Sequence, residues 1–441
     1  MPIPITSAST ILECSALSSR QNTSEASIVN CRLKSAKLPT MSPTMNPLTQ
    51  AARSLIAELY PRAVELRHRL HRVPELAFQE VHTARLIRAE LTSNGIPFTE
   101  GPPDAPTATV AVLGDPTKPC IALRADIDAL PITEATGLPY ASTHEGRMHA
   151  CGHDGHAANL VLVASILKRL EAQLPVCVKC IWQPAEEGGG GAERLVKAGV
   201  LTGHFAGPPV KEIYGLHGWP NLDLGAVSTK PGPLLASTDT FIARFRGKGG
   251  HGAYPHLCID PIIIAAQFVT TVQTTVAREI DPTDSCVVSM GKFHAGTAIN
   301  VIPDEAVVEG TIRTLNPSTR AIAVEAVRRR ALGIAAAAGG SVDFKHNVGY
   351  PATINDDTAT TKVEQIAQST VGPARYIRAT KPSMGGEDFA YYGSQAKACF
   401  FLVGVKPPNR DTYPGLHTDT YDFTDEALKT ASDMMLSIVL S

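Results

Sequence analysis

The 441-residue sequence has no apolar run close to the roughly 18 residues that a membrane-spanning helix needs, which excludes a transmembrane placement. It also lacks an excess of charge, because 40 Lys and Arg residues oppose 42 Asp and Glu residues and leave a net charge of −2. A nucleic-acid-binding protein usually carries a basic excess on one face, so this balance argues against that class. The nine cysteines are odd in number and scattered, which disfavours a secreted disulfide scaffold and fits reduced thiols in a cytoplasmic enzyme.

Residues 1–50 differ from the rest of the chain. They include 20 Ser, Thr or Pro residues, show no sustained periodicity and carry a net charge of +2. Such a segment buries too little apolar surface to offset the entropy of ordering it, and it lacks the apolar core of a secretory signal. We expect a disordered N-terminal extension here. An organellar transit peptide and a start at Met41 or Met45 are the alternatives.

From Ala51 onward, helical and strand patterns alternate. The expected helices are residues 51–71 (with a break at Pro61), 157–174 and 192–201, and the expected strands are 108–113, 120–124, 176–182 and one ending near His217. Strands that alternate with helices predict an α/β layer with a largely parallel, buried sheet.

The pattern changes after about Thr229. The expected elements are then strand 240–246, helix 261–280, strand 286–293, strand 305–315, helix 318–338 and strand 341–348. This β-α-β-β-α-β order is typical of a small α+β, ferredoxin-like sandwich. Polar, turn-rich sequence returns near Pro351. We therefore predict a discontinuous α/β catalytic domain, residues 51–229 and 350–441, with a second domain, residues 230–349, inserted into it.

The densest group of potential metal ligands is His149–His156, which contains three histidines, a cysteine and an aspartate. A solvated polar loop is the alternative interpretation, because each of these groups would need a partner in a core. Thiolate and imidazole ligands together suit Zn²⁺, Mn²⁺, Co²⁺ or Ni²⁺ better than Ca²⁺ or Mg²⁺. The segment precedes an expected helix, and such junctions often carry the sites of open α/β sheets.

A second polar group, Glu186 and Glu187, directly follows an expected strand and precedes four glycines. Adjacent carboxylates in extended backbone point in opposite directions, so one can face a metal while the other faces a substrate. The glycines allow close approach of a ligand but are no phosphate loop, because no Lys-Ser/Thr follows them. His217 and His417 each follow Gly-Leu, and either histidine alone would more often be structural than a ligand.

Several long segments together carry a family resemblance. They are Arg124–Pro131, His149–His156, Gln183–Gly189, Gly249–His256, Asn300–Pro303, Gly386–Phe389 and Gly415–His417. From about residue 51 to its end the chain resembles the M20 metallopeptidases, specifically the amidohydrolase branch (subfamily D) of hippurate, N-acyl-amino-acid and auxin-conjugate hydrolases. The resemblance implies a zinc-peptidase-like catalytic domain, with a mixed sheet flanked by helices, and an inserted lid and dimerisation domain.

The resemblance also implies two divalent metal ions per subunit, Mn²⁺ or Zn²⁺, with Co²⁺ or Ni²⁺ also open. The ligands that it implies are Cys151, His153, Glu187, His217 and His417. Glu186 takes the position of the general acid/base, and Asp128 is interpreted as a support for a ligand histidine. The metals would activate a water molecule, and Glu186 would move its proton to the leaving amine.

Three residues of the inserted domain complete this prediction by resemblance. His251 would donate to the oxyanion of the reaction from the partner subunit of a homodimer. Asn300 and Arg313 would recognise a substrate carboxylate, a task that suits the bidentate guanidinium group. A solvated strand charge is the alternative for Arg313.

Three further features need separate interpretation. Gly386 stands where this branch often has Ser, so a role for a hydroxyl there is in doubt. Cys177 and Cys180 are spaced like a redox or zinc pair, but they lie in an expected buried strand that would turn their thiols to opposite faces. Cys151 can also be interpreted as a nucleophile, although the residues around it favour a ligand.

The predicted function is metal-dependent hydrolysis of the amide bond in a small N-acyl or amide-conjugated amino acid. One alternative is a dipeptidase or carboxypeptidase that acts on a peptide bond. The other is a catalytically silent scaffold for binding or dimerisation, which the intact Glu186 and the complete ligand set disfavour.

Overall fold

The computed structural model describes residues 47–408 and 410–441. The predicted N-terminal extension lies outside the described residues, except for residues 47–50, which are helical. Helix α1 (Pro47–His71) begins before Ala51 and continues through Pro61, where we expected a break. Pro61 is exposed, and α1 buries Ile56 and Leu66 on either side of it, so packing outweighs the loss of one helical hydrogen bond.

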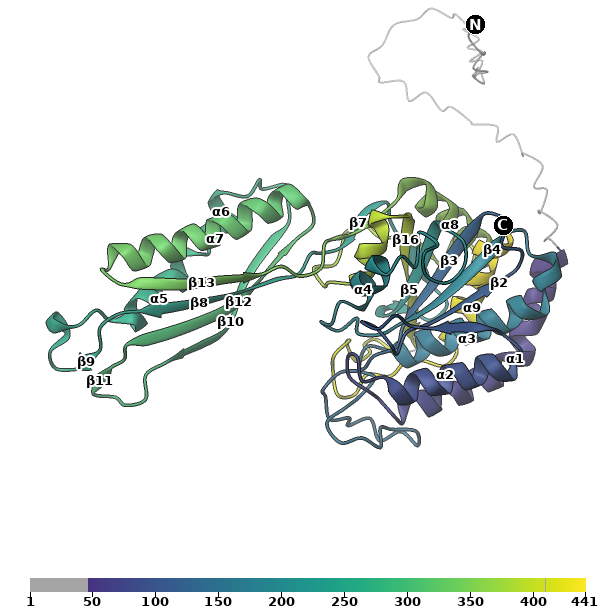
Figure 1. The fold of residues 1–441 in the computed structure, drawn as a ribbon, viewed down its shortest axis with the longest axis horizontal. Helices are drawn as coiled ribbons and strands as arrows, with labels where there is room; N and C mark the ends of the chain where they lie inside the picture. The colour runs from purple at the N-terminus through teal and green to yellow at the C-terminus, as the bar shows by residue number, and fades with distance from the viewer. Residues whose placement is uncertain (1–46, 409) are drawn as a thin grey trace, which may run out of the picture. The chain divides into compact units, whose positions relative to one another are not determined.

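The main sheet has eight strands in the order β1-β2-β4-β3-β5-β16-β6-β15. Their bounds are β1 Phe98–Glu100, β2 Thr109–Leu113, β3 Cys120–Asp126, β4 Cys177–Gln183, β5 Val210–Asp223, β6 Val227–Thr229, β15 Tyr376–Arg378 and β16 Lys397–Lys406. Strands β4, β3, β5 and β16 run parallel to one another, whereas the β1–β2, β2–β4 and β16–β6 pairs are antiparallel. The sheet is therefore mixed, with the parallel part at its centre (Figure 1).

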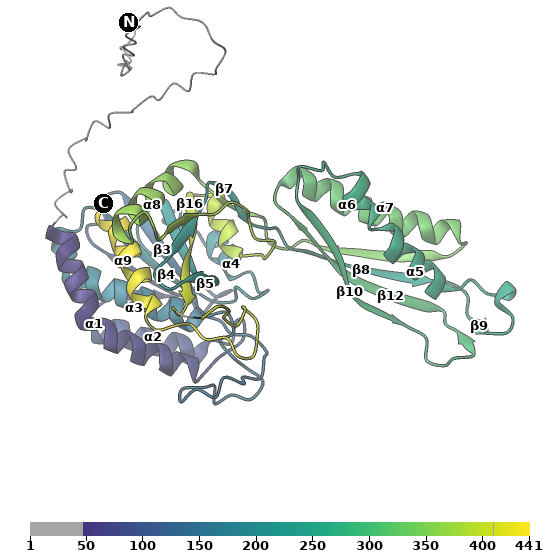
Figure 2. The same cartoon turned by 180° about the vertical axis from the view of Figure 1, so that it is seen from behind.

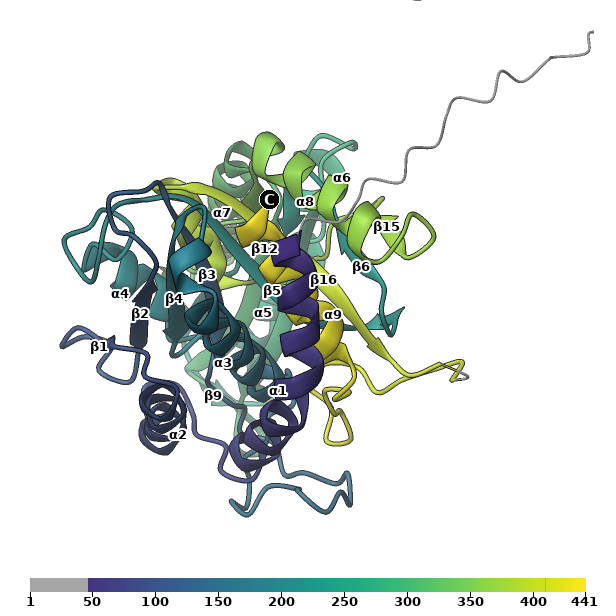
Figure 3. The same cartoon turned by 90° about the vertical axis from the view of Figure 1, so that its right-hand side faces the viewer.

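Helices cover both faces of this sheet. They are α2 Val81–Ser93, α3 His153–Arg169, α4 Gly191–Lys197, α8 Asp357–Thr370, α9 Ala427–Leu440 and the 3₁₀ helix η3 Asp388–Ser394, in addition to α1. Successive side chains of strand β3 face opposite sides of the sheet. Leu123 packs into the core beneath α1, α3 and α9, and Ala122 packs into a second core with α4 and η3. Figure 3 shows α1, α3 and α9 side by side on the first face.

The segment 239–347 forms its own four-stranded antiparallel sheet, in the order β10-β12-β8-β13 (Figure 2). Its elements are β8 Asp239–Arg246, α5 Pro261–Thr271, α6 Thr274–Arg278, β10 Cys286–Ala295, β12 Glu305–Thr314, α7 Pro317–Ala337 and β13 Ser341–Asn347. They occur in the expected order, except that the single helix expected at 261–280 is two helices. Phe241, Phe245 and Phe268 are fully buried in a core of this segment alone. Its standing as an independent domain stays a prediction.

Two short antiparallel pairs complete the described structure. Strand β9 (Gly250–His251) pairs with β11 (Val301–Ile302), and β7 (Gly232–Leu235) pairs with β14 (Thr353–Asn355). The second pair joins the residues where the chain leaves the main sheet and where it returns. None of the described helices combines the length and the apolar character that crossing a bilayer requires.

Candidate metal centre and substrate cavity

Four segments that are far apart in the sequence bring the five predicted ligands together. Cys151 lies just before α3, and His153 is the first residue of that helix. Glu187 lies in the turn between β4 and α4, and His217 is on β5. His417 lies in the loop between β16 and α9. Ligand atoms of Cys151, His153 and His217 fall within 4.8 Å of one another, as do those of Cys151, Glu187 and His417.

Hydrogen bonds set the tautomers of the two buried histidines. The Nδ1 atom of His153 lies 2.9 Å from the main-chain oxygen of Asp128, and that of His217 lies 2.7 Å from the oxygen of Gly218. Because a carbonyl oxygen only accepts, both Nδ1 atoms donate, which leaves Nε2 of each ring as the atom that can bind a metal ion in place of a proton. Ligand histidines in proteins are commonly held in this way. The Nε2 of His217 lies 3.3 Å from the Sγ atom of Cys151.

His156 shows the contrasting arrangement. Its Nδ1 atom lies 2.6 Å from the carboxylate of Asp126, and its Nε2 accepts a hydrogen bond of 2.9 Å from the main-chain nitrogen of Gly218. Both ring nitrogens therefore have partners within the protein. His156 supports the backbone beside His217 and is not available as a ligand.

The two adjacent glutamates lie in a turn, and our expectation of extended backbone with opposed side chains is wrong. Ala185 before them has a φ of +57°, and its nitrogen donates to Glu80 at 2.9 Å. The nitrogens of Glu186 and Glu187 donate to the two carboxylate oxygens of Asp128, at 3.0 and 2.9 Å. The turn brings both side chains close to His153. Asp128 thus supports the glutamate pair as well as the histidine.

The two carboxyl groups differ in their affinity for a proton. Burial raises the pKa of Glu186 well above its ordinary value, and the nearby charges of Glu387 and Glu187 raise it further. Burial also acts to raise the pKa of Glu187, but the hydrogen bond with His417 and the charge of His153 lower it below its ordinary value. The surroundings therefore favour the ionised form of Glu187 and the protonated form of Glu186.

The donor set fits a divalent transition-metal ion. It combines a thiol, three imidazoles and a carboxylate. Within the described part of the chain, Nε2 of His153 is buried and makes no hydrogen bond, as expected for an atom that awaits a ligand. Burial acts to lower the pKa of His153, yet the charge of Asp126 and the hydrogen bond with Asp128 raise it to about 10. The surroundings therefore stabilise positive charge at this point.

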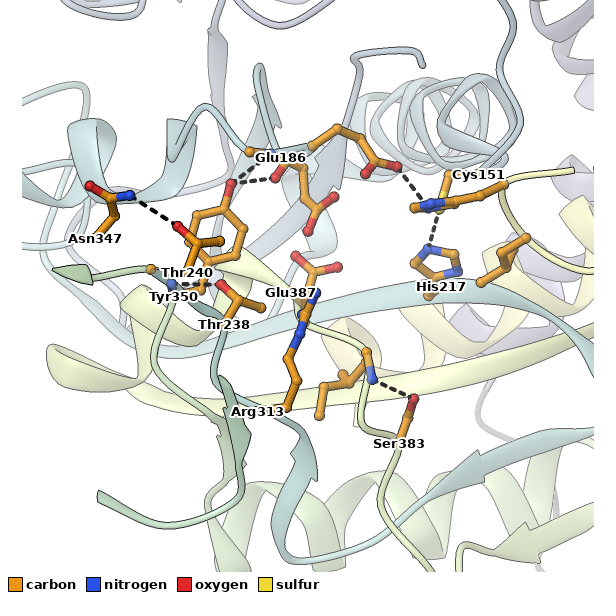
Figure 4. Close-up of a pocket in the computed structure, with 18 of the residues that line it drawn as sticks. Cys151, Glu186, His217, Thr238, Thr240, Arg313, Asn347, Tyr350, Ser383 and Glu387 are labelled. Atoms are coloured by element: carbon orange, nitrogen blue, oxygen red, sulfur yellow. Dashed lines mark hydrogen bonds and ion pairs between the residues drawn. The ribbon is translucent and has the colours of Figure 1, made fainter. Parts of the chain in front are cut away.

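A cavity of about 710 Å³ opens beside these ligands (Figure 4). Cys151, Glu186 and His217 line one side, and Arg313 and Thr238 line the other. Arg313 comes from β12, so the inserted segment contributes to the same cavity. At Gly386 an added Cβ atom would lie 2.0 Å from Cγ2 of Thr238, so Thr238 fills the space that a serine side chain would need.

Tyr350 is a site residue that the sequence reasoning missed. Its hydroxyl donates to the main-chain oxygen of Glu186 at 2.6 Å and accepts from the nitrogens of Gly188 and Gly190 at 2.8 and 3.2 Å. These bonds hold the turn that carries the glutamates. The only local signal was the position of Tyr350 at the return to the main sheet, which does not reveal a partner 164 residues away.

His251 and Asn300 do not line this cavity. They lie together beside the β9–β11 pair, where the nitrogen of Gly252 donates to the main-chain oxygen of Asn300 at 2.8 Å. Both side chains are exposed. Of the three residues predicted on the inserted segment, the structure brings only Arg313 to the ligands of the same chain.

A buried ionic network supports the far side of the glutamate turn. Arg124 on β3 donates to Asp126 at 2.7 Å and to Glu387 and Asp388 at 2.9 Å each. Asp388 in turn accepts from the nitrogen of Ala192 at the start of α4. The acids of the segment Gly386–Phe389, to which the sequence pattern assigned no role, thus balance the charge of Arg124.

The cysteine pair on β4 agrees with the sequence interpretation. Cys177 and Cys180 are fully buried and pack into the cores on opposite faces of the sheet. The described cysteines are all unpaired by disulfides. This arrangement excludes a dithiol or zinc site formed by these two residues.

Comparisons with known proteins agree with this geometry. A model of Peptidase family M20/M25/M40 matches residues 122–441. The chain is 38% identical over 385 residues to an N-acetylcysteine deacetylase of Bacillus subtilis (strain 168), a match that covers 86% of this chain and 97% of that protein. It is 36% identical over 398 residues to the IAA-amino acid hydrolase ILR1-like 4 of Arabidopsis thaliana, a match that covers 89% of this chain and 87% of that protein.

A solved structure shares the fold. A dinuclear metal-binding peptidase of the M20 family from Bacillus subtilis superposes with a TM-score of 0.74 at 37% identity, covering 87% of this chain and 98% of that one. The family resemblance predicted from the sequence segments is thereby confirmed. This chain belongs to Peptidase family M20/M25/M40.

Proposed function

We propose that this protein is a metal-dependent hydrolase that cleaves the amide bond of N-acyl or amide-conjugated amino acids. The observation that carries the proposal is the pair His153 and His217: each ring is oriented by a hydrogen bond at Nδ1, and both have a ligand atom within 4.8 Å of that of Cys151. Three relatives bear names of the matching chemistry: N-acetylcysteine deacetylase, IAA-amino acid hydrolase and N-acetyldiaminopimelate deacetylase.

Two divalent ions would be held by the five converging side chains, Cys151, His153, Glu187, His217 and His417. Mn²⁺ and Zn²⁺ are the ions that this donor set favours, and Co²⁺ and Ni²⁺ are compatible with it. When bound, the ions lower the pKa of a water molecule and polarise the amide carbonyl group.

Glu186 would move the proton in this reaction. Its carboxylate takes the proton of the attacking water, and the resulting carboxyl group delivers it to the nitrogen of the leaving amine. The second step needs a group that holds the proton until the amine leaves, and the raised pKa of Glu186 favours this. Asp128 and Tyr350 keep the turn in place while the proton moves.

Substrate recognition would use the inserted segment of two chains. Arg313 lines the cavity and would bind the substrate carboxylate through its guanidinium group. His251 and Asn300 are exposed, and Tyr254, Ile299 and other apolar side chains near them are exposed as well. A surface of this kind favours burial against a second copy. We place a homodimer here, in which His251 donates to the oxyanion and Asn300 contacts substrate in the partner's site.

We also place the protein in the cytoplasm. The seven described cysteines are free, and five of them are buried. Reduced thiols of this kind are typical of a reducing compartment.

The test is a metal-removal and substrate-panel assay on the full chain. The protein is stripped with a chelator and assayed before and after addition of Mn²⁺ or Zn²⁺ against N-acetyl, N-benzoyl and indole-acetyl amino acids and against dipeptides. We expect no turnover without metal and faster turnover of acylated amino acids than of dipeptides with it. Activity that survives complete metal removal would overturn the metal mechanism. Preference for dipeptides would favour the peptidase alternative, and no turnover in metal-loaded protein would favour the scaffold.

A further inference from the structure

Asp239 is a fully buried carboxylate at the start of β8, where the chain enters the inserted segment. It accepts two hydrogen bonds from the guanidinium group of Arg320, at 2.6 and 2.9 Å, and one from Nε2 of His346 at 2.8 Å. The nitrogen of Gly349 donates to it at 3.3 Å. Burial acts to raise the pKa of Asp239, but the bonds with Arg320 and His346 lower it below its ordinary value. An ionised carboxylate therefore lies where the inserted segment joins the main sheet region.

The bonds of this carboxylate connect the stretch by which the chain enters the inserted segment with the stretch by which it returns. Arg320 also donates to the main-chain oxygen of Gly349 at 2.9 Å. The nitrogen of Thr238 donates to the oxygen of Tyr350, and the nitrogen of Tyr350 donates to Oγ1 of Thr238, each at 2.9 Å. A Cβ atom added to Gly349 would overlap the main-chain oxygen of Thr238. The two backbones thus approach as closely as only a glycine allows.

The same two stretches form one wall of the substrate cavity. Its residues, termed the junction wall, are Thr238, Thr240, Asn347, Gly349 and Tyr350. The four of them that are labelled in Figure 4 lie across the cavity from Cys151 and His217. Successive side chains of a strand point to opposite faces, so Asp239 is directed away from the cavity that Thr238 and Thr240 line. Asp239 can therefore act on the cavity only through its neighbours.

Arg313 depends on the same part of the fold for its position. The residue before it, Ile312, pairs with Asp239 in the register of β12 and β8. The residue after it, Thr314, accepts a hydrogen bond of 2.7 Å from the nitrogen of Ser237 at its main-chain oxygen. The guanidinium group of Arg313 forms no hydrogen bond or ion pair with any residue that the structure describes. Its place in the cavity is therefore set by the strand that carries it.

We propose that Asp239 is a positioning residue, and that its bonds with Arg320 and His346 hold the junction wall and Arg313 where a substrate carboxylate can bind. This inference rests on the proposed function, in which Arg313 binds that carboxylate. It places determinants of specificity on residues that do not line the cavity, since neither Asp239 nor Arg320 belongs to its lining.

The experiment measures kcat and KM of the Mn²⁺-loaded full chain for N-acetyl-, N-benzoyl- and indole-acetyl-L-alanine and for the corresponding alaninamides. The amides replace the substrate carboxylate by a neutral group, so the ratio of kcat/KM for acid over amide measures recognition of the carboxylate. Arg320→Met removes both bonds to Asp239 and Arg320→Lys keeps the charge. His346→Ala is the second variant if Arg320→Met does not fold. Arg328→Met, an exposed arginine of the same helix α7, is the matched control.

We expect Arg320→Met to lower the acid-to-amide ratio at least about tenfold, mainly through a higher KM for the acid, because a small displacement of a binding group is costly. Metal content, measured by elemental analysis, should not change. Arg320→Lys should recover part of the loss, since an ammonium group lacks the bidentate geometry. Arg328→Met should keep the ratio within about twofold of the unmodified protein.

Two outcomes would overturn this inference while hydrolysis persists. One is a ratio near unity in the unmodified protein. The other is a ratio that Arg320→Met and His346→Ala leave unchanged, even if both variants unfold more easily, because the bonds of Asp239 would then serve stability alone. Absence of metal-dependent hydrolysis of every acylated substrate would instead overturn the proposed function.

Discussion

The main sheet region and the inserted segment differ in what their cores contain. Around the main sheet, Arg67 and Arg124 are fully buried, together with Asp126 and Asp154. Within residues 239–347, all of which the structure describes, Asp239 is the one buried charged side chain, and the core consists of Phe, Val, Ile and Ala. A buried charge is costly unless it is paired. The buried pairs of Arg67 with Asp154 and of Arg124 with Asp388 lie next to the segments that carry the candidate ligands.

Two examples show this use of charge. Arg67 donates to Asp154 at 3.1 Å, and Asp154 directly follows His153 in the first turn of α3. Arg124 connects β3 with Glu387 and Asp388, which lie against the glutamate turn. In the inserted segment, by contrast, pairs such as Arg328 with Glu325 are half-exposed. Apart from Asp239 at the start of β8, which pairs with Arg320, that segment packs around an apolar core.

The largest expected effect concerns the two adjacent glutamates. Glu186→Gln should lower kcat by about 10²–10⁴-fold, because the amide can neither accept nor deliver the proton. Its metal content, measured by elemental analysis, should stay at the unmodified level. The matched variant Glu187→Gln should lose metal as well as activity. Full activity of Glu186→Gln, or equal metal loss in both variants, would contradict the division of roles.

The second effect compares one arginine from each region. Arg124→Met leaves Asp126, Glu387 and Asp388 without their buried cation and should lower the free energy of unfolding by about 3–5 kcal/mol. Arg328→Met on the exposed face of α7 should change it by less than about 0.5 kcal/mol. Urea unfolding followed by circular dichroism measures both. If both variants lost similar unfolding free energy, the two regions would not differ in how far they depend on buried charge.

The third effect is a pH dependence of stability due to His71. Burial acts to lower the pKa of His71, but the charge of Asp154 and its hydrogen bond at 2.9 Å raise it from 6.5 to about 9. The folded state thus binds the proton more tightly, so this contribution is complete below pH 6.5 and is lost as the pH rises through 9. We expect the difference in unfolding free energy between the unmodified protein and His71→Gln to shrink by about 3 kcal/mol from about pH 6 to about pH 10. A difference that is constant with pH would contradict the ion pair.

The smallest effect concerns Arg313, the cavity residue of the inserted segment. Arg313→Ala should raise KM for acylated amino acids about 10–100-fold with little change in kcat, because it removes binding that is equal in the ground and transition states. Arg313→Lys should recover only part of the loss, since an ammonium group lacks the bidentate geometry. An unchanged KM in Arg313→Ala would return Arg313 to the role of a solvated strand charge.

Local patterns were sufficient for much of the fold. Apolar spacing located α3, β4 and β12 to within a few residues, because burial on one face imposes a helix or strand period on the sequence. The spacing did not reveal that α1 continues through Pro61, nor that residues 261–280 form two helices. In α1, tertiary contacts on both sides of Pro61 outweigh the tendency of proline to end a helix. A sequence pattern records that tendency but not the contacts.

By itself, the sequence determined the identity of the five candidate ligands and of the adjacent glutamate, because those residue types stand in long segments that few families share. Tertiary structure decided which ring atoms can bind a metal ion. Hydrogen bonds from Nδ1 to main-chain oxygens orient His153 and His217. Both ring nitrogens of His156, three residues from His153, instead form hydrogen bonds with Asp126 and Gly218. It also decided that Tyr350 holds the glutamate turn and that Trp219 lies between two adjoining cavities. These features depend on contacts between residues far apart in the chain, and the directions of such contacts are set only when the elements pack.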